Sequence, residues 1–479
     1  MYKYPNQRYK LSTVAACLIL VLQISGCSIG PDYKNPEISL PEKFTNIPVS
    51  SPNKIQQEQL WWQAFQDKTL DNLIEEGVKA NLEVQRALTR INQSRALANE
   101  AFAELFPTGI LNGSYVKAED SGSRFPVGGK FGYQVYSLSV DAAWEIDLFG
   151  RHRREYESRN AEYEQQIAEL HNAQTIIISE IASTYFQLRA NQLQLKIAQE
   201  NEALQKSTVD LVNQKVGFGL ISELDLARAE AQLAKLRASL PNLEAAVKIN
   251  IHRLAVILGR QPTSLYKDFD KVRELPDFNG PMEIKTPAEL LKQRPDIKSA
   301  ERRLAADTAR IGVAVGEFFP KVKILGSLGI DAVKFSKLSP NNSFYSFGPS
   351  ISWSPLDSGR LLSQVTFRKQ AAKESLLAYN QTVLTALEEV ENALVKYSAE
   401  NKRRIQLAIA EKSAKRAYKI ADDQYREGTL DFTSVLDTQR SLLDSQSEVV
   451  ESKKLLSLAL VDIYKAFGGG WEAWDLKSK

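Results

Sequence analysis

The chain has 479 residues, and its 61 basic and 58 acidic side chains give a formal net charge of only +3, with both signs mixed along the sequence. No basic block suggests a nucleic-acid partner, so none is expected. The two cysteines and three histidines are too few and too scattered for a metal site, and we expect no catalytic residue, no bound metal, no cofactor and no enzymatic activity.

The first 26 residues predict an export signal. Three basic residues, Lys3, Arg8 and Lys10, precede an apolar stretch from Leu11 to Ile24. This stretch has 14 residues, whereas a membrane-spanning helix needs ~20. An uncleaved N-terminal anchor helix is therefore the less favoured alternative.

Residues Ile24-Ser25-Gly26-Cys27 resemble the bacterial lipobox, in which the cysteine is acylated and becomes the mature N-terminus. Two or more acyl chains hold a protein stably at a membrane, so we predict that Cys27 anchors the chain in lipid. Position 28 is Ser rather than the Asp that retains many such lipoproteins at the inner membrane, and by resemblance this favours the outer membrane. Because Cys17 leaves with the signal, the mature chain keeps no free thiol.

The first structural repeat is predicted over residues 67–257, after an irregular N-terminal segment at 27–66. It begins with apolar positions at helical spacing from Leu70 to Leu105, which predict one helix that ends before Pro107. A β-hairpin follows over residues 108–149, and the alternation of apolar and polar residues is clear in its second strand and weak in its first.

A long helix follows the hairpin. More than 50 residues after Arg151 lack proline and predict a helix of 60 to 68 residues, on the order of 90 to 100 Å long. The fragment Gly217-Phe-Gly219-Leu-Ile-Ser222 begins like a phosphate-binding glycine loop, but it lacks the third glycine and follows a helix rather than a strand. We interpret it as a tight turn near Gly219, after which a helix returns.

The same order of elements is predicted again over residues 287–466, after an irregular linker at 258–286 and before an irregular C-terminal segment at 467–479. The elements are a helix from Pro287 to Phe319, a β-hairpin over residues 321–357, a long proline-free helix after Arg360, a turn near Gly428 and a returning helix.

The two repeats also align residue by residue. At a constant offset of 213 residues Phe106-Pro107 meets Phe319-Pro320 and Gly113 meets Gly326, and at an offset of 209 Trp144 meets Trp353 and Gly219 meets Gly428. The spacing from Arg151 to Gly219 and from Arg360 to Gly428 is 68 residues in both. A duplicated unit is the simplest explanation.

The predicted hairpins have two interpretations, a half-buried soluble sheet or strands that cross a membrane. Their length of about 9 to 11 residues, the aromatic residues Trp144, Tyr345 and Trp353 near strand ends, and the export signal favour membrane strands. Four strands cannot close a membrane barrel, because an open edge in lipid leaves unpaired amides. The expected fold class is therefore mainly α, with a contribution to a membrane β-barrel shared between chains.

Seven short motifs, in this order, resemble those of the TolC/OprM family of outer-membrane efflux proteins over nearly the whole mature chain. They are Gly30-Pro31-Asp32-Tyr33, Trp61-Trp62-Gln-Ala-Phe65, Trp144-Glu-Ile-Asp-Leu-Phe-Gly-Arg151, Gln293-Arg294-Pro295-Asp296-Ile297, Phe318-Phe319-Pro320, Leu436-Asp437-Thr-Gln-Arg440 and Phe467-Gly-Gly-Gly-Trp471. The resemblance implies a homotrimer with a twelve-stranded outer-membrane β-barrel, a periplasmic α-barrel of twelve helices, and an equatorial belt built from the irregular segments.

Such a tube conducts passively, so the resemblance implies the exit duct of a tripartite efflux system for small toxic compounds or drugs, antibiotics included. Its partners would be an inner-membrane pump of the resistance-nodulation-division class, a periplasmic adaptor protein and outer-membrane lipid. The expected location is the outer membrane of a Gram-negative bacterium, lipid-anchored and extending into the periplasm. Two alternatives stay open: the exit duct of a type I protein secretion system, and a non-conducting structural lipoprotein.

The two turns, around Val216 to Ser222 and Tyr425 to Asp431, carry a glycine at equivalent repeat positions, and each ends a rod ~100 Å from the strands. Contact with the adaptor is expected at the tips that carry Gly219 and Gly428. The alternative is that these glycines only permit the backbone of a tight turn.

A periplasmic gate is expected just above the turns. The family's acidic constriction maps onto Asp437, and its lock of tyrosine to aspartate maps onto Tyr425 and Asp225. An arginine that strengthens this lock in some members is replaced here by Leu430. The alternative for each position is an ordinary solvated carboxylate or a packed tyrosine.

Overall fold

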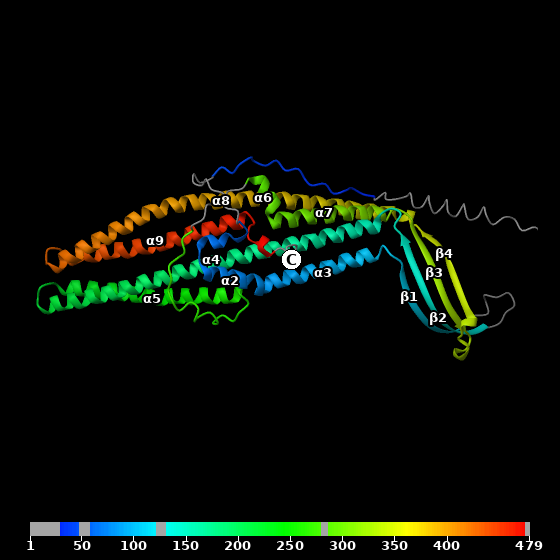
Figure 1. The fold of residues 1–479 in the computed structure, drawn as a ribbon, viewed down its shortest axis with the longest axis horizontal. Coiled ribbons are helices and arrows are strands. Elements are labelled where there is room, and N and C mark those ends of the chain that lie inside the picture. Colours follow the sequence, from blue (N-terminus) through cyan, green and yellow to red (C-terminus); the bar gives the residue numbers. More distant parts are fainter. Residues whose placement is uncertain (1–28, 47–57, 121–130, 279–285, 475–479) are drawn as a thin grey trace, which may run out of the picture. The chain divides into compact units, whose positions relative to one another are not determined.

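The computed structural model describes residues 29–46, 58–120, 131–278 and 286–474 (Figure 1). The export signal and Cys27 lie outside these residues, so the lipid anchor stays a prediction. The chain forms two compact units. The first comprises the described part of Met1–Glu37 with Ile91–Gln166 and Ser299–Tyr379, and the second comprises the described parts of Ile38–Arg90, Ile167–Lys298 and Asn380–Lys479.

Two long helices and two returning helices confirm the helical pattern of the sequence. The long helices are α4 (Arg151–Gly217) with 67 residues and α8 (Ser358–Arg426) with 69. The returning helices are α5 (Glu223–Ile257) and α9 (Phe432–Ala466), with 35 residues each. The described chain also contains short 3-10 helices: η1 (Glu58–Phe65), η3 (Phe335–Lys337), η4 (Pro340–Asn342), η5 (Pro355–Asp357) and η6 (Trp471–Trp474).

No helix within the described ranges is both long enough and apolar enough to cross a membrane.

The prediction of one continuous helix before each hairpin is wrong. The first is divided into α2 (Lys68–Ala80) and α3 (Leu82–Ala103), and the second into α6 (Pro287–Gln293) and α7 (Pro295–Gly316). Asn81 leaves the helical conformation because its amide donates to the Ile257 carbonyl at 2.7 Å and its oxygen caps Glu83 N–H at 2.8 Å. Arg294 is extended because the ring of Pro295 disfavours helical backbone in the preceding residue.

The four strands form one antiparallel sheet in the order β1-β2-β3-β4 (Figure 1). They are β1 (Thr108–Asp120), β2 (Phe131–Ile146), β3 (Lys321–Ala332) and β4 (Ser343–Ser352). The first three have 13, 16 and 12 residues and are longer than expected, and Trp353 lies just beyond β4. Within the described chain, β1 and β4 each pair along one side only.

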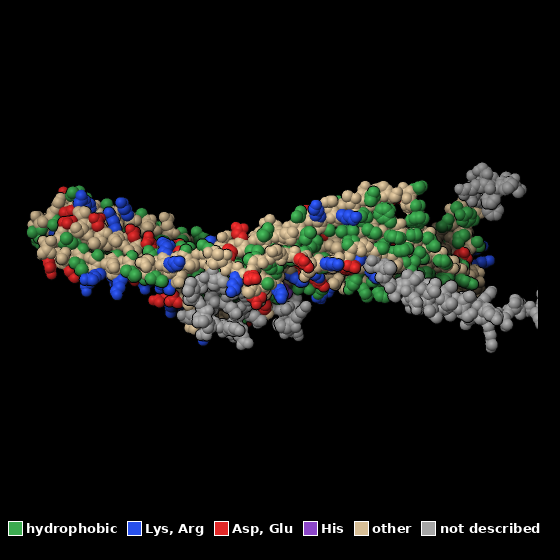
Figure 2. All heavy atoms as spheres, turned by 90° about the horizontal axis from the view of Figure 1, so that it is seen from above, with side chains coloured by type: hydrophobic (Ala, Val, Ile, Leu, Met, Phe, Trp, Pro, Cys, Tyr) green, Lys and Arg blue, Asp and Glu red, His purple; other side chains and the backbone are tan. Residues whose placement is uncertain are grey.

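The sheet has an apolar and a polar face. Leu111, Val140, Leu328 and Tyr345 are register neighbours across all four strands, and each is between 52% and 84% exposed. On the other face Asp141 accepts hydrogen bonds from Ser327 at 2.5 Å and from Ser139 at 3.2 Å. Figure 2 shows hydrophobic side chains gathered in the part of the molecule that carries the strands.

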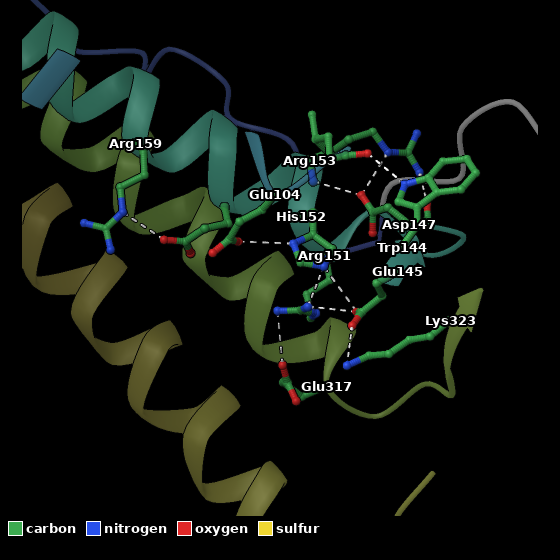
Figure 3. A network of polar contacts seen from close by, with 12 residues as sticks. Glu104, Trp144, Glu145, Asp147, Arg151, His152, Arg153, Arg159, Glu317 and Lys323 are labelled. Carbon is green, nitrogen blue, oxygen red and sulfur yellow. Dashed lines mark hydrogen bonds and ion pairs between the residues drawn. The ribbon is translucent and has the colours of Figure 1, made fainter. Parts of the chain in front are cut away.

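The strand-to-helix junctions repeat the same bond in both halves. The indole N–H of Trp144 donates to the Leu105 carbonyl at 3.0 Å, and that of Trp353 donates to the Phe318 carbonyl at 3.0 Å. At the first junction, Figure 3 shows Glu145 between Arg151 and Lys323, with nitrogen–oxygen distances of 2.8 and 3.6 Å. This network fixes the start of α4 against the end of β2.

The second compact unit has an aromatic core that joins its N-terminal and C-terminal segments. The Trp61 ring stacks on Tyr464 at 5.0 Å and the Trp62 ring stacks on Trp474 at 5.5 Å between centroids. The Trp471 ring stacks on His171 of α4 at 4.0 Å. These stacking contacts explain why the segments before α2 and after α9 contain tryptophans.

Candidate functional site

The two interhelical turns have the same backbone geometry, which confirms the turn predicted at each glycine. Gly219 has φ +69° and Gly428 has φ +80°, the left-handed region that favours glycine. The N–H of Gly219 donates to the Val216 carbonyl at 2.8 Å, and that of Gly428 donates to the Tyr425 carbonyl at 3.1 Å. The next N–H in each turn bonds the carbonyl five residues back, which completes a Schellman motif.

Exposed apolar side chains surround the first turn. Phe218 is 79% and Leu220 is 69% exposed, and Leu224 at the start of α5 is also exposed. Contiguous exposed apolar patches mark sites of interaction with other proteins. The repeat pattern identifies only the glycine of this turn, although both apolar residues lie directly beside it in the sequence.

Tyr425 is buried beneath the turns. Its ring lies 5.5 Å from the ring of Phe432 in a cluster that also contains Val212, Ala229 and Val435. Within the described chain its hydroxyl has no hydrogen-bond partner. Burial, and to a smaller extent the charge of Asp225, raise the pKa of Tyr425.

Asp225 lies near Tyr425 but is not hydrogen-bonded to it in the single chain. Its carboxylate is 3.8 Å from the guanidinium of Arg228 on the same helix. Arg228 in turn donates to the hydroxyl of Thr433 at 3.1 Å, which links α5 to α9. The structure therefore brings the two residues of the expected lock close together and leaves the contact between them open.

Lys215 is a residue of this site that the sequence did not reveal. Its ammonium lies 4.0 Å from the centroid of the Tyr425 ring and donates to the main-chain oxygen of Tyr425 at 3.0 Å. The two residues are 210 positions apart, so no local pattern connects them.

Asp437 is exposed on α9, one turn beyond Thr433. Its carboxylate is 4.0 Å from the guanidinium of Arg440, whose Nε donates to the side-chain oxygen of Gln232 on α5 at 3.1 Å. The carboxylate is therefore solvent-exposed, with only a long ion pair to Arg440 among the described residues.

In the first compact unit, the motif that starts at Gly30 packs against α4 and α7. Gly30 has φ +96°, and a side chain there would clash with the backbone of Gly312, whereas a side chain on Gly312 would clash with Arg154 and the Ile29 carbonyl. Arg154 donates to the Ile29 carbonyl at 3.2 Å and to Asp32 at 2.5 Å. The hydroxyl of Tyr33 donates to Glu301 of α7 at 2.6 Å.

Within the described residues, no group of three or more His, Cys, Asp or Glu side chains is placed to hold a metal ion.

Comparison with known proteins gives one consistent result. The family described as outer membrane efflux protein matches residues 68–260 and 286–469. Nodulation protein T of Rhizobium leguminosarum bv. trifolii is 32% identical, over 94% of this chain and 96% of that protein. The pyoverdine export outer membrane protein OpmQ of Pseudomonas aeruginosa is 28% identical, over 97% of each chain.

Solved structures agree. The outer-membrane channel OprN superposes with a TM-score of 0.88 and 37% sequence identity, over 93% of this chain and 100% of that one. The CmeC outer membrane channel of Campylobacter jejuni shares the fold, with a TM-score of 0.86 and 22% identity, over 94% of this chain and 97% of that one. The chain belongs to the outer membrane efflux protein family and is the outer-membrane channel component of a Gram-negative efflux pump.

Proposed function

We propose that the chain assembles as a homotrimer and forms the exit duct through which an inner-membrane pump and a periplasmic adaptor export small organic compounds. The observation that carries this proposal is the four-stranded sheet, which has an exposed apolar row and, within the described chain, no partner strand on the outer edges of β1 and β4. In lipid an unpaired strand edge costs several kcal/mol for each unsatisfied amide, so the sheet must close against other copies. Three copies would contribute twelve strands, the number that the family resemblance implies.

The adaptor docks at the interhelical turns in this proposal. The exposed Phe218 and Leu220 beside Gly219 supply an apolar anchor of the kind that dominates protein interfaces. Gly219 and Gly428 set the left-handed backbone that holds both tips in the same shape.

The gate lies around the buried Tyr425, with Lys215 holding its ring and carbonyl. Asp225 becomes a partner of Tyr425 when neighbouring copies crowd the tips, and Asp437 contributes one negative charge from each copy to the mouth. A ring of like carboxylates in a narrow pore favours cations.

Cys27 carries the acyl anchor, and the Gly30 motif holds the chain that follows it against α4 and α7. The pump belongs to the proton-driven resistance-nodulation-division class. Relatives named for antibiotics, toluene and pyoverdine support small organic molecules as the transported class.

The channel is tested by recording single channels from the purified protein in planar lipid bilayers, with chemical cross-linking to count copies. We expect discrete conductance steps and a cross-linked trimer. A monomer without conductance contradicts the proposal.

Docking is tested by Phe218→Asp. The control is Asn213→Asp, at an exposed position of α4, which adds the same charge without removing an apolar side chain. Phe218→Asp should abolish drug efflux in cells and leave single-channel conductance unchanged, whereas the control should transport normally. Normal efflux from Phe218→Asp places the docking surface elsewhere.

A further inference from the structure

A cavity of about 780 Å³ lies in the first compact unit between α4, α7 and α8. Arginines come from all three helices: Arg159 from α4, Arg310 from α7, and Arg360 and Arg368 from α8. Two glutamates, Glu155 and Glu317, also line it, so its lining carries more positive than negative charge. The volume is that of a typical small-molecule site.

Most of these charges already have partners. Glu155 accepts from Arg159 at 2.8 Å, and Glu317 pairs with Lys321 at 2.8 Å. Arg310 pairs with Asp307 at 2.5 Å.

Arg368 has no ion pair among the described side chains, and its guanidinium carbon lies 5.5 Å from the centroid of the Phe367 ring. Among the described side chains Arg360 pairs with Asp357, which accepts from its Nε at 2.8 Å and also from its Nη2, and Arg360 is itself exposed. The α8 side of the cavity therefore offers one unpaired guanidinium group, that of Arg368, and a second, ion-paired one beside an exposed aromatic ring.

The cavity and the N-terminal motif lie on opposite faces of α7. The motif packs on Gly312, whereas the cavity is lined by Arg310 and Ala314. Arg310 and Ala314 are each two residues from Gly312, which is about 200° around a helix of 3.6 residues per turn, and Val313 at the cavity's edge is one residue away, about 100°. On α4, Tyr33 packs near Ala161 and the cavity uses Arg159, two residues away, while Glu155 of the cavity directly follows Arg154, which binds the motif.

This opposition assigns a side to the cavity. A lipid anchor at Cys27 requires the Gly30 motif to lie on the outer, lipid-accessible side of the wall. The face of α7 turned away from the motif is then the face toward the duct, so the cavity opens to the path of the transported compound.

We propose that this cavity is a transit site for amphipathic organic anions, an inference that rests on the proposed duct. The planar guanidinium groups of Arg360 and Arg368 suit a carboxylate, which they can bind through paired hydrogen bonds. The ring of Phe367 and the side chain of Val313 contact the apolar part of the same molecule. The site favours compounds that join an aromatic group to a single negative charge.

The test is block of single-channel current in planar bilayers by 2-naphthoate, with the neutral 2-naphthalenemethanol as the matched probe. Arg360→Gln combined with Arg368→Gln removes the two cations. Lys369→Gln combined with Lys373→Gln removes the same charge from exposed positions of α8 outside the cavity.

We expect 2-naphthoate to block the wild type more strongly than the alcohol. The arginine variant should raise the half-blocking concentration by about tenfold, as loss of charge-assisted hydrogen bonds predicts. The lysine variant should stay close to wild type. Equal block by both probes, or equal loss of block in both variants, overturns the transit site while the channel remains. A wild type that does not conduct overturns the duct itself, and the transit site with it.

Discussion

Lys215 of α4 binds Tyr425 of α8 twice, through the face of its ring at 4.0 Å and through its main-chain oxygen at 3.0 Å. Tyr425 lies in the last turn of α8, where the helix carries partial negative charge that a lysine stabilises. One side chain thus joins the two long helices, one from each repeat, directly below the turns.

Replacement of this lysine should loosen the gate. Lys215→Met keeps the length of the side chain but loses the cation–π contact, which is worth ~0.5 to 2 kcal/mol, and the hydrogen bond. Single-channel conductance, or the fraction of time spent open, should rise several-fold. The control is Lys206→Met, the same substitution at an exposed position of α4. If the two variants conduct alike, Lys215 does not hold the gate.

Arg294 should be essential for stability. Its side chain is buried and donates two hydrogen bonds to Asp296, at 3.0 and 2.6 Å. It also pairs with Glu389 at 2.6 Å and donates to the Ala466 carbonyl at 2.8 Å. Arg294→Ala leaves two partly exposed carboxylates without their cation and removes a bond to a buried carbonyl, so the loss should lie at or below the ~3 to 5 kcal/mol of a fully buried pair. Chemical denaturation in detergent should show that decrease. Lys292→Ala, at an exposed position of α6, should cost less than about 1 kcal/mol by the usual scale of surface changes.

The sequence predicted the helices, strands and turns well because these follow from local periodicity and from glycine at fixed repeat positions. Gly219 and Gly428 were found because the repeat aligns them and only a left-handed backbone needs them. The break at Asn81 was missed because its cause is a bond to Ile257, which is 176 residues away. The break before Pro295 carried a local signal, since the residue before proline avoids the helical conformation, but the apolar pattern outweighed it.

Site chemistry was harder to predict than the fold. Tyr425, Asp225 and Asp437 were placed by resemblance alone, and their roles remain predictions. Lys215 was missed because a cation over an aromatic ring has no sequence signature when the partners come from different repeats. The arginine cavity was missed for the same reason, since three separate helices supply its lining.

Tyr418 should make the folded protein less stable in alkali. Burial, helped by the charge of Asp422, raises the pKa of Tyr418 to about 12, against ~10 in an unfolded chain. Below pH ~10 the hydroxyl is protonated in both states, so it contributes no pH dependence. Between pH ~10 and 12 the unfolded chain ionises first, and the free energy of unfolding therefore falls as pH rises.

Tyr418→Phe removes this contribution. Urea denaturation of the detergent-solubilised protein at several pH values should show a shallower decline above pH ~10 in the variant than in the wild type. Other tyrosines with raised pKa values, such as Tyr185 at about 12, leave part of the decline in place. Identical slopes for wild type and variant contradict the assignment to Tyr418.

Asp437 and Arg440 should set the ion selectivity of the periplasmic mouth in opposite directions. Both are exposed, and at 4.0 Å their ion pair contributes little stability, so either can be replaced without unfolding α9. In a trimer, Asp437→Asn removes three negative charges from the mouth and should lower the ratio of potassium to chloride permeability. Arg440→Gln removes three positive charges and should raise that ratio, while the double variant should return toward wild type.

The measurement is the reversal potential in a tenfold salt gradient across a planar bilayer. Shifts of the same sign in both single variants, or none, would mean that these residues lie away from the ion path, and the acidic constriction would have to be sought elsewhere on the turns.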